Sequence, residues 1–141
     1  ALDPFAGDAP AIAAGALAAV EADIAAGRPV LVYSTAAPDV VTGVQSQLGR
    51  ERAASLIEEA LSIVARELVA RGVRRLVVAG GETAGAIVQA LGVEALAIGR
   101  EIDPGVPWTT ALGTQPLALA LKSGNFGTTD FFAKALAMLP D

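Results

Sequence analysis

Two adjacent glycines, Gly80 and Gly81, stand between two stretches of different character. Residues 76–79 form a short apolar stretch, which is typical of a buried strand, whereas residues 82–91 carry apolar side chains at helical spacing. The backbone therefore has to pass from strand to helix at the glycines. Free N–H groups and the positive end of the helix dipole attract anions there, and glycines admit a phosphate because they lack Cβ. The junction predicts either an anion site or only a tight turn.

The composition favours a single α/β domain and limits its chemistry. The 141 residues are 53% hydrophobic but only 4% aromatic, which fits helices and buried strands better than a β-sandwich. There is no cysteine and no histidine, so disulfides, thiolate or imidazole metal sites and histidine bases are excluded. The net charge of −5 argues against a nucleic-acid platform, because phosphate backbones select basic surfaces.

The longest apolar stretch, residues 9–20, is too short to span a bilayer and ends at Glu21. It also lacks the basic flank of a signal peptide. We therefore expect a cytoplasmic protein that does not interact with membranes.

Apolar spacing and turn residues predict alternating helices and strands along the chain. Helices are expected over residues 10–26, 50–70, 82–91 and 129–139, and strands over residues 30–33, 76–79, 95–98, 109–112 and 116–121. Thr128 or Thr129 is expected to cap the last helix, with Asp130 in its first turn.

These elements predict an α/β fold, a three-layer sandwich with a mostly parallel sheet and a C-terminal hairpin. The strand, helix and strand of residues 76–98 have the spacing of a crossover unit, and the last two strands form the hairpin. We expect residues 1–9 to be a linker, residues 10–141 to be the domain, and residues 40–49 to be a loop.

Three predicted strands end in small or glycine residues: one at Ser34, one at the glycine pair and one at residues 122–127. The carboxyl ends of strands in an α/β sheet converge on one edge, so all three could line one cleft. At the second, Thr83 offers a hydroxyl, and Glu82 could cap the helix or bind a ribose hydroxyl or a magnesium-bound water. Against phosphate, the Glu82 carboxylate would need a cation or a sideways orientation.

The third strand end combines several groups suited to a nucleotide. Lys122 supplies a cation, Asn125 an amide, and Gly124 a position where the backbone could approach a ligand. An equally simple interpretation is a hairpin exit with a surface lysine.

Two other residues have structural interpretations. Asp103 precedes Pro104 and Gly105, so it is expected to form a turn, although a loop carboxylate could also act in catalysis. Trp108, the only tryptophan, is expected to pack in a core or an interface.

Together, residues 30–34, 80–85, 99–108 and 121–127 resemble the C-terminal nucleotide-binding domain of the four-carbon acid sugar kinase family. The resemblance extends over residues 27–136 and rests on four motifs in the family's order. Members of this family combine an N-terminal sugar-acid-binding domain with a C-terminal ATP-binding domain and phosphorylate threonate, erythronate or 3-oxo-tetronates. Some relatives carry names as type III effector Hop proteins. The chain departs from the family at Ala84, where relatives often carry Ser, and at Thr128, where a small residue is common.

The resemblance implies the cofactors ATP and Mg²⁺ and a role in carbohydrate metabolism. It implies ATP contacts for six residues: Ser34, Gly80, Gly81, Glu82, Thr83 and Gly124. The chemistry of the last loop adds Lys122 and Asn125 as candidate contacts. No metal-ligating residue is assigned in the chain.

The family's acceptor site and catalytic base lie in its N-terminal domain, so the catalytic residues are expected outside this chain. We therefore expect the isolated chain to bind ATP weakly and to be inactive, and the sugar acid to bind through the other domain. The start at Ala1 without an initiator methionine favours a truncated protein. Homo-oligomer formation is compatible with the sequence.

Two other functions are considered. A non-catalytic effector or regulatory domain could keep the fold and use its surface for a partner. A nicotinamide-dependent oxidoreductase is disfavoured, because no Gly-x-Gly-x-x-Gly with a ribose-binding acid follows any predicted strand.

Overall fold

The computed structural model describes residues 1–4, 6–34, 43, 46, 49–113, 116–124 and 126–138 of the chain. These residues form two compact units, Ala1–Leu68 and Val69–Asp141. Within the described residues, no helix is both long and apolar enough to cross a membrane.

The first unit contains helix α1 (Ala9–Ala25) and most of helix α3 (Arg50–Ala70), whose residues Val69 and Ala70 belong to the second unit. Helix α1 begins after Asp8, whose carboxylate accepts a hydrogen bond from Ala11 N at 3.0 Å, as an N-cap residue does. Leu2 and Ile12 are buried together with Ala60 of α3. Both helix predictions are confirmed. Because Leu2 packs into this core, at least this part of the predicted linker is tied to the unit.

The prediction of a strand over residues 30–33 is wrong. Val32 packs on the two-helix core while Leu31 and Tyr33 are exposed, so the apolar alternation is present. However, residues 31–34 belong to no strand, and the backbone bond there joins Leu2 N to Tyr33 O at 2.7 Å. An extended segment can therefore place one apolar face on helices without a sheet. In the predicted loop 40–49, Gly43 and Ser46 are helical, and apart from Gly49 the remainder lies outside the described residues.

The second unit contains one sheet and two helices. In chain order they are β1 (Arg75–Ala79), α4 (Gly81–Ala90), β2 (Leu96–Asp103), β3 (Val106–Ala111), β4 (Ala118–Lys122) and α5 (Phe131–Ala137). The strand order in the sheet is β1-β4-β3-β2. The α/β class, the strand and helix around the glycine pair, and the C-terminal hairpin of β3 and β4 are confirmed.

The pairing of the strands differs from the predicted one. The β1–β4 ladder is parallel, whereas β2–β3 and β3–β4 are antiparallel. Strands β1, β2 and β4 therefore run in one direction and β3 in the other. The two strands of the predicted crossover unit, β1 and β2, are the two edge strands of the sheet, because two successive hairpins place β3 and β4 between them. Strand β2 continues beyond the predicted strand of residues 95–98 through residues 99–103, and the hairpin turns at Pro104 and Gly105, where Gly105 has φ +80°.

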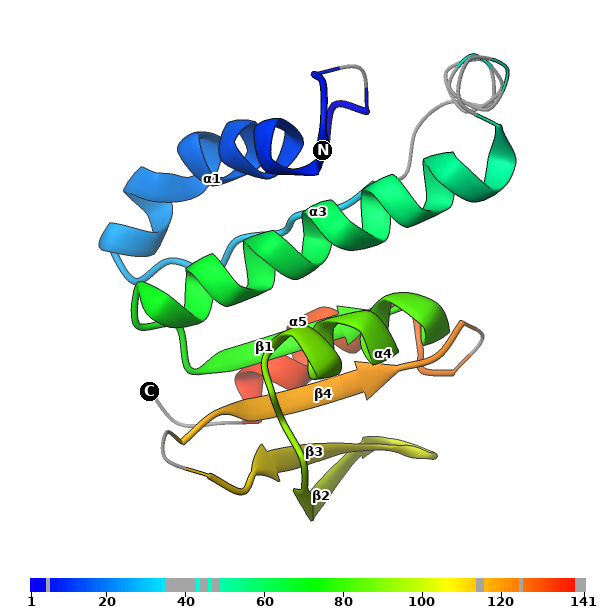
Figure 1. Cartoon of the computed structure of the whole chain (residues 1–141). Coiled ribbons are helices and arrows are strands. Elements are labelled where there is room, and N and C mark those ends of the chain that lie inside the picture. The colour runs from blue at the N-terminus through cyan, green and yellow to red at the C-terminus, as the bar shows by residue number, and fades with distance from the viewer. Residues whose placement is uncertain are drawn as a thin grey trace. The chain divides into compact units, whose positions relative to one another are not determined.

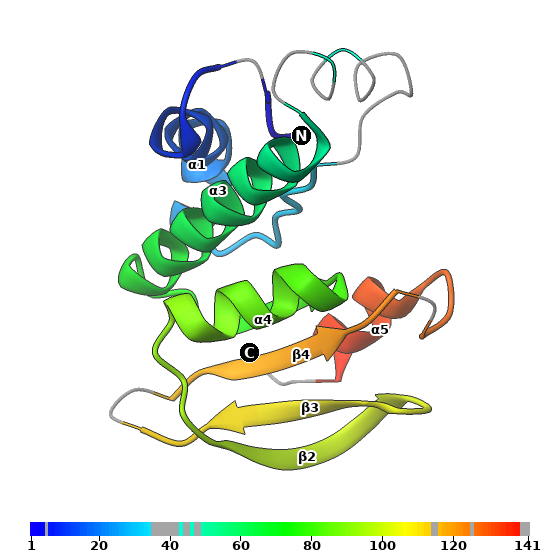
Figure 2. The same cartoon turned by 45° about the vertical axis from the view of Figure 1, so that its right-hand side comes forward.

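Helices α4 and α5 cover opposite faces of this sheet, which gives three layers (Figures 1 and 2). On the α5 face, Trp108 and the paired Ala120 pack with Phe131 and Ala135. The Trp108 Nε1–H also donates to the carbonyl of Ala135 at 2.9 Å, so its prediction as a core residue is confirmed. Leu119, on the neighbouring position of β4, is fully buried.

We predict that Leu119→Ala destabilises the chain by about 2–5 kcal/mol, because it leaves a cavity in the central strand β4. Urea unfolding followed by far-ultraviolet circular dichroism measures the change. Leu112→Ala is the matched control: Leu112 is 57% exposed, so its loss should stay within about 0.5 kcal/mol. Equal losses of stability in the two variants would contradict the burial of Leu119 in the core of the sheet.

Candidate functional site

The glycine turn lies where β1 ends and α4 begins. Gly80 is the N-cap of α4 and has φ 119° and ψ 126°, a backbone conformation that residues other than glycine rarely adopt. A Cβ on Gly80 would also lie 3.2 Å from Thr83 Oγ1. On Gly81, by contrast, a Cβ would meet nothing within 4 Å, and the residue is exposed. The first turn of α4 is therefore open to solvent at the point where its backbone N–H groups begin.

The end of β4 lies directly beside this turn. Ala79 is paired with Lys122 in the parallel ladder, and Gly80 N–H donates to Lys122 O at 2.8 Å, which continues the pairing by one residue. The ammonium of Lys122 donates to Gly124 O at 2.8 Å, so the lysine is folded over the loop that follows its own strand. The structure thus brings together the second and third of the predicted strand ends.

The predicted site residues of the second unit therefore fall into one neighbourhood. Glu82 is exposed and Thr83 half-buried on the first turn of α4, and Gly124 is exposed in the loop after Lys122. Asn125 lies outside the described residues. Ser34 belongs to the first unit, where it is exposed and follows an extended segment rather than a strand. The roles of all these residues stay predictions.

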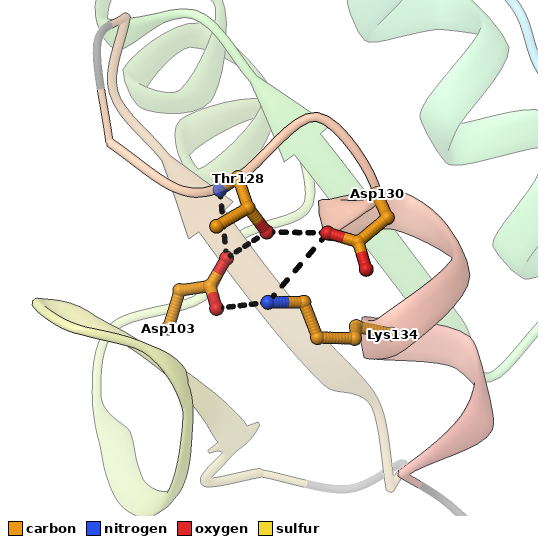
Figure 3. Close-up of polar contacts among 4 residues, drawn as sticks. All are labelled: Asp103, Thr128, Asp130 and Lys134. Carbon is orange, nitrogen blue, oxygen red and sulfur yellow. Dashed lines mark hydrogen bonds and ion pairs between the residues drawn. The ribbon is translucent and has the colours of Figure 1, made fainter.

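A second polar cluster lies at the carboxyl end of β2 (Figure 3). Asp103, the last residue of β2, is only 6% exposed, and its Oδ2 accepts from Thr128 N at 2.9 Å and from Thr128 Oγ1 at 3.0 Å. Its Oδ1 forms an ion pair with Lys134 of α5. Asp130 Oδ1 lies 2.5 Å from Thr128 Oγ1, so the two aspartates share the single hydroxyl proton, and it lies 3.7 Å from the Lys134 ammonium. The cluster joins β2, the loop after β4 and α5.

The electrostatics of the cluster keep its charges in place. The hydrogen bond from Lys134, followed by that from Thr128 N–H, lowers the pKa of Asp103 below its usual range. The same hydrogen bond, which Lys134 donates to Asp103, raises the pKa of Lys134. Asp130 also has a lowered pKa, mainly because of the Thr128 hydroxyl. At neutral pH the cluster therefore holds two carboxylates and one ammonium.

Sequence reasoning missed most of this cluster. Asp103 does precede the turn at Pro104, as predicted, but its carboxylate binds Thr128 and Lys134, which are 25 and 31 residues away. The cap of α5 was also predicted wrongly: the N-cap is Asp130, without a side-chain cap bond, and the helix starts at Phe131. Thr128 does not cap because its N–H and hydroxyl face the two aspartates. The only feature of the sequence that points to this cluster is the spacing of Asp130 and Lys134, which are four residues apart, as in an ion pair along a helix.

The fold defines a class, the α/β domains in which a strand-to-helix glycine turn meets the end of a neighbouring parallel strand. Residues 3–132 match the model of a family described as nucleotide-binding C-terminal domain. The chain belongs to this family, the C-terminal nucleotide-binding domains of the four-carbon acid sugar kinases.

Curated relatives support this membership. A Pseudomonas savastanoi pv. phaseolicola protein named 3-oxo-tetronate kinase is 62% identical over 114 residues, which are 81% of this chain and 27% of that protein. A Cupriavidus necator protein of the same name is 58% identical over 98% of this chain and 32% of its own length. The chain spans about a third of the length of these relatives or less.

Solved structures show the same fold. A Salmonella typhimurium LT2 protein is 35% identical, with a TM-score of 0.80 over 99% of this chain and 34% of that chain. A Haemophilus influenzae protein is 44% identical, with a TM-score of 0.69 over 76% of this chain and 26% of that chain.

The charged cluster predicts a specific loss of stability in acid. Because the pKa of Asp103 is lowered in the folded state, its contribution is present above its unfolded pKa of about 3.9 and is lost as the pH falls through the lower, folded pKa. We expect the urea midpoint of the native chain to fall more between pH 7 and pH 3 than that of Asp103→Asn, which carries no titrating carboxyl at this position. If the urea midpoints of the two proteins fell equally between pH 7 and pH 3, the lowered pKa of Asp103 in the folded state would be contradicted.

Proposed function

We propose that this chain holds ATP for a kinase that phosphorylates a four-carbon sugar acid at its terminal hydroxyl, and that 3-oxo-tetronate is the acid. The observation that carries the proposal is the glycine turn of β1 beside Lys122 of β4. The relatives named 3-oxo-tetronate kinase support the choice of acid over threonate or erythronate.

The residues present fit a nucleotide phosphate. Gly81 leaves open space where a side chain would stand, on the first turn of a ten-residue helix whose dipole favours negative charge at this end. Lys122 can add a positive charge: an ammonium has three donors, so its bond to Gly124 O does not exhaust it. We assign the polyphosphate to the N–H groups of the turn and to Lys122, with Gly124 and Asn125 on the loop side.

The remaining assignments follow from charge. The exposed carboxylate of Glu82 would repel a bare phosphate, so we assign it to a water of Mg²⁺ or to a ribose hydroxyl. Thr83 supplies a hydroxyl on the same helical turn. Mg²⁺ would be held mainly by the phosphates, as is usual in kinases, and would neutralise charge on them.

In this proposal the chain contributes positioning and electrostatic stabilisation rather than a catalytic base. Phosphoryl transfer needs the nucleotide to be held in line with the attacking hydroxyl, and fixed N–H groups and a lysine stabilise charge on the transferred group. We place the sugar-acid site and the base in the part of the kinase outside this chain, and the whole enzyme in the cytoplasm, where ATP is available. A Bordetella bronchiseptica relative forms a domain-swapped dimer, which supports testing for a homo-oligomer.

We predict that Gly81→Val weakens ATP binding at least about tenfold, because the branched side chain would occupy the space assigned to phosphate. Isothermal titration calorimetry with Mg·ATP measures the affinity. The fold should persist, since Gly81 has no positive φ and its Cβ meets no atom.

Gly113→Val is the matched control for this substitution. A Cβ added at Gly113 would also meet open space. However, Gly113 follows β3, which runs opposite to β1, so it lies at the other end of the strands. Its ATP affinity should be unchanged. Equal affinities for the native chain and Gly81→Val would overturn the proposed function and favour a non-catalytic domain that keeps the fold.

We also predict that the chain alone has no kinase turnover and does not bind four-carbon acids. A coupled ADP assay with 3-oxo-tetronate, threonate and erythronate, together with calorimetry for each acid, tests both statements. Binding of any of these acids to the chain by itself would contradict the division of labour between the two parts of the kinase.

A further inference from the structure

We propose that Asp103 is a positioning residue that holds the lysine loop, defined here as residues 122–124 and 126–128, in the conformation needed for ATP. This inference rests on the proposed function and adds a residue outside the turn and the loop. Strand β2 runs in the same direction as β1 and β4, so the carboxyl ends of the three strands, including Asp103, lie at the same end of the sheet.

The first end of the lysine loop is fixed by the glycine turn. Lys122 O accepts the Gly80 N–H at 2.8 Å, and Lys122 Nζ donates back to Gly124 O at 2.8 Å. Phe126 N–H then donates to Ser123 O at 3.2 Å, which closes a turn within the loop. These bonds define where the loop starts but leave its far end to other contacts.

The far end is fixed by Asp103. One carboxylate oxygen accepts both the N–H and the hydroxyl of Thr128, at 2.9 and 3.0 Å, and the other is held by Lys134 of α5 (Figure 3). Bonds to an ionised acceptor are stronger than bonds between neutral groups. The carboxylate is buried, whereas Thr128 is exposed, so the acceptor is the rigid partner and the loop is the part being held.

Close packing connects the two ends. Gly127 has φ +85°, and a Cβ on it would lie 2.9 Å from the Phe131 ring and 3.3 Å from Lys122 Cε. The backbone next to Thr128 therefore lies against the side chain that we assign to phosphate. On the other side, Phe126 approaches Gly105 so closely that a Cβ there would lie 3.0 Å from its ring. A displacement of Thr128 would therefore move the backbone at Gly127, against which the Lys122 side chain lies.

The geometry also argues against Asp103 acting as a base. Both carboxylate oxygens are occupied by donors, and the group is 6% exposed. The lowered pKa makes it a poor proton acceptor at neutral pH. Its effect on catalysis must therefore pass through Thr128 and the lysine loop.

The test compares Thr128→Val with Thr128→Ser in the full-length kinase. Valine has the shape of threonine and keeps the backbone N–H but removes the hydroxyl, whereas serine keeps both donors to Asp103. We expect the valine variant to raise the KM for ATP about tenfold, with the KM for the sugar acid unchanged, and the serine variant to restore the native value. Because Thr128 is exposed, both variants should fold.

Asp103→Asn provides the second measurement, since it removes the charge that holds Lys134 and weakens the acceptor for Thr128. The KM for ATP should rise here too, at saturating sugar acid. Unchanged KM values for ATP in both Thr128→Val and Asp103→Asn, with only the thermal midpoint lowered, would show a purely structural cluster and overturn the inference. By contrast, an unchanged ATP affinity in Gly81→Val would overturn the proposed function. The failure of this inference and the failure of the proposed function are therefore distinguishable.

Discussion

The parallel pairing of β1 with β4 is the constraint on which the candidate site depends. These strands are separated in the sequence by α4 and the β2–β3 hairpin, yet their register places Ala79 opposite Lys122. The bond from Gly80 N to Lys122 O extends that ladder into the turn. A shift of one residue would exchange the two faces of β4 and take the lysine away from the glycines. The position of the cation relative to the helix start is therefore fixed by the core of the sheet and not by the loops themselves.

The local elements of this site could be predicted from the sequence, but their neighbours could not. An apolar run, two glycines and a helical pattern were sufficient for β1 and α4, and the hairpin of β3 and β4 followed from its turn residues. The order of the strands depends on which hairpin occupies which edge, and this information is not local. Residues 30–33 show the same limit, because packing Val32 against helices satisfies an apolar alternation as well as a ladder does. Asp103 is the clearest example: a carboxylate before Pro and Gly predicts a turn, and nothing nearby in the sequence indicates partners at Thr128 and Lys134.

The cluster of Asp103 also explains why a charged residue is kept in a buried position. A buried carboxylate is costly unless it is paired and hydrogen-bonded, and here both oxygens have donors. Such pairs add little stability compared with apolar residues of similar volume, but they specify geometry. In this domain the geometry specified is that of a loop containing two glycines, Gly124 and Gly127, which would otherwise have many accessible conformations. Ordering that loop before the ligand binds reduces the entropy lost on binding.

Charge makes this ordering more important. The chain carries a net charge of −5, so its overall field does not attract a polyanion. Under the proposed function, affinity for ATP would come from short-range groups: the N–H donors at the start of α4, its dipole and Lys122. Interactions of this kind decay within one helical turn and depend on orientation, so they are effective only if the donors are already in place. A protein of this charge can bind a nucleotide weakly through a correctly shaped turn, and more strongly only when the neighbouring loop is held as well.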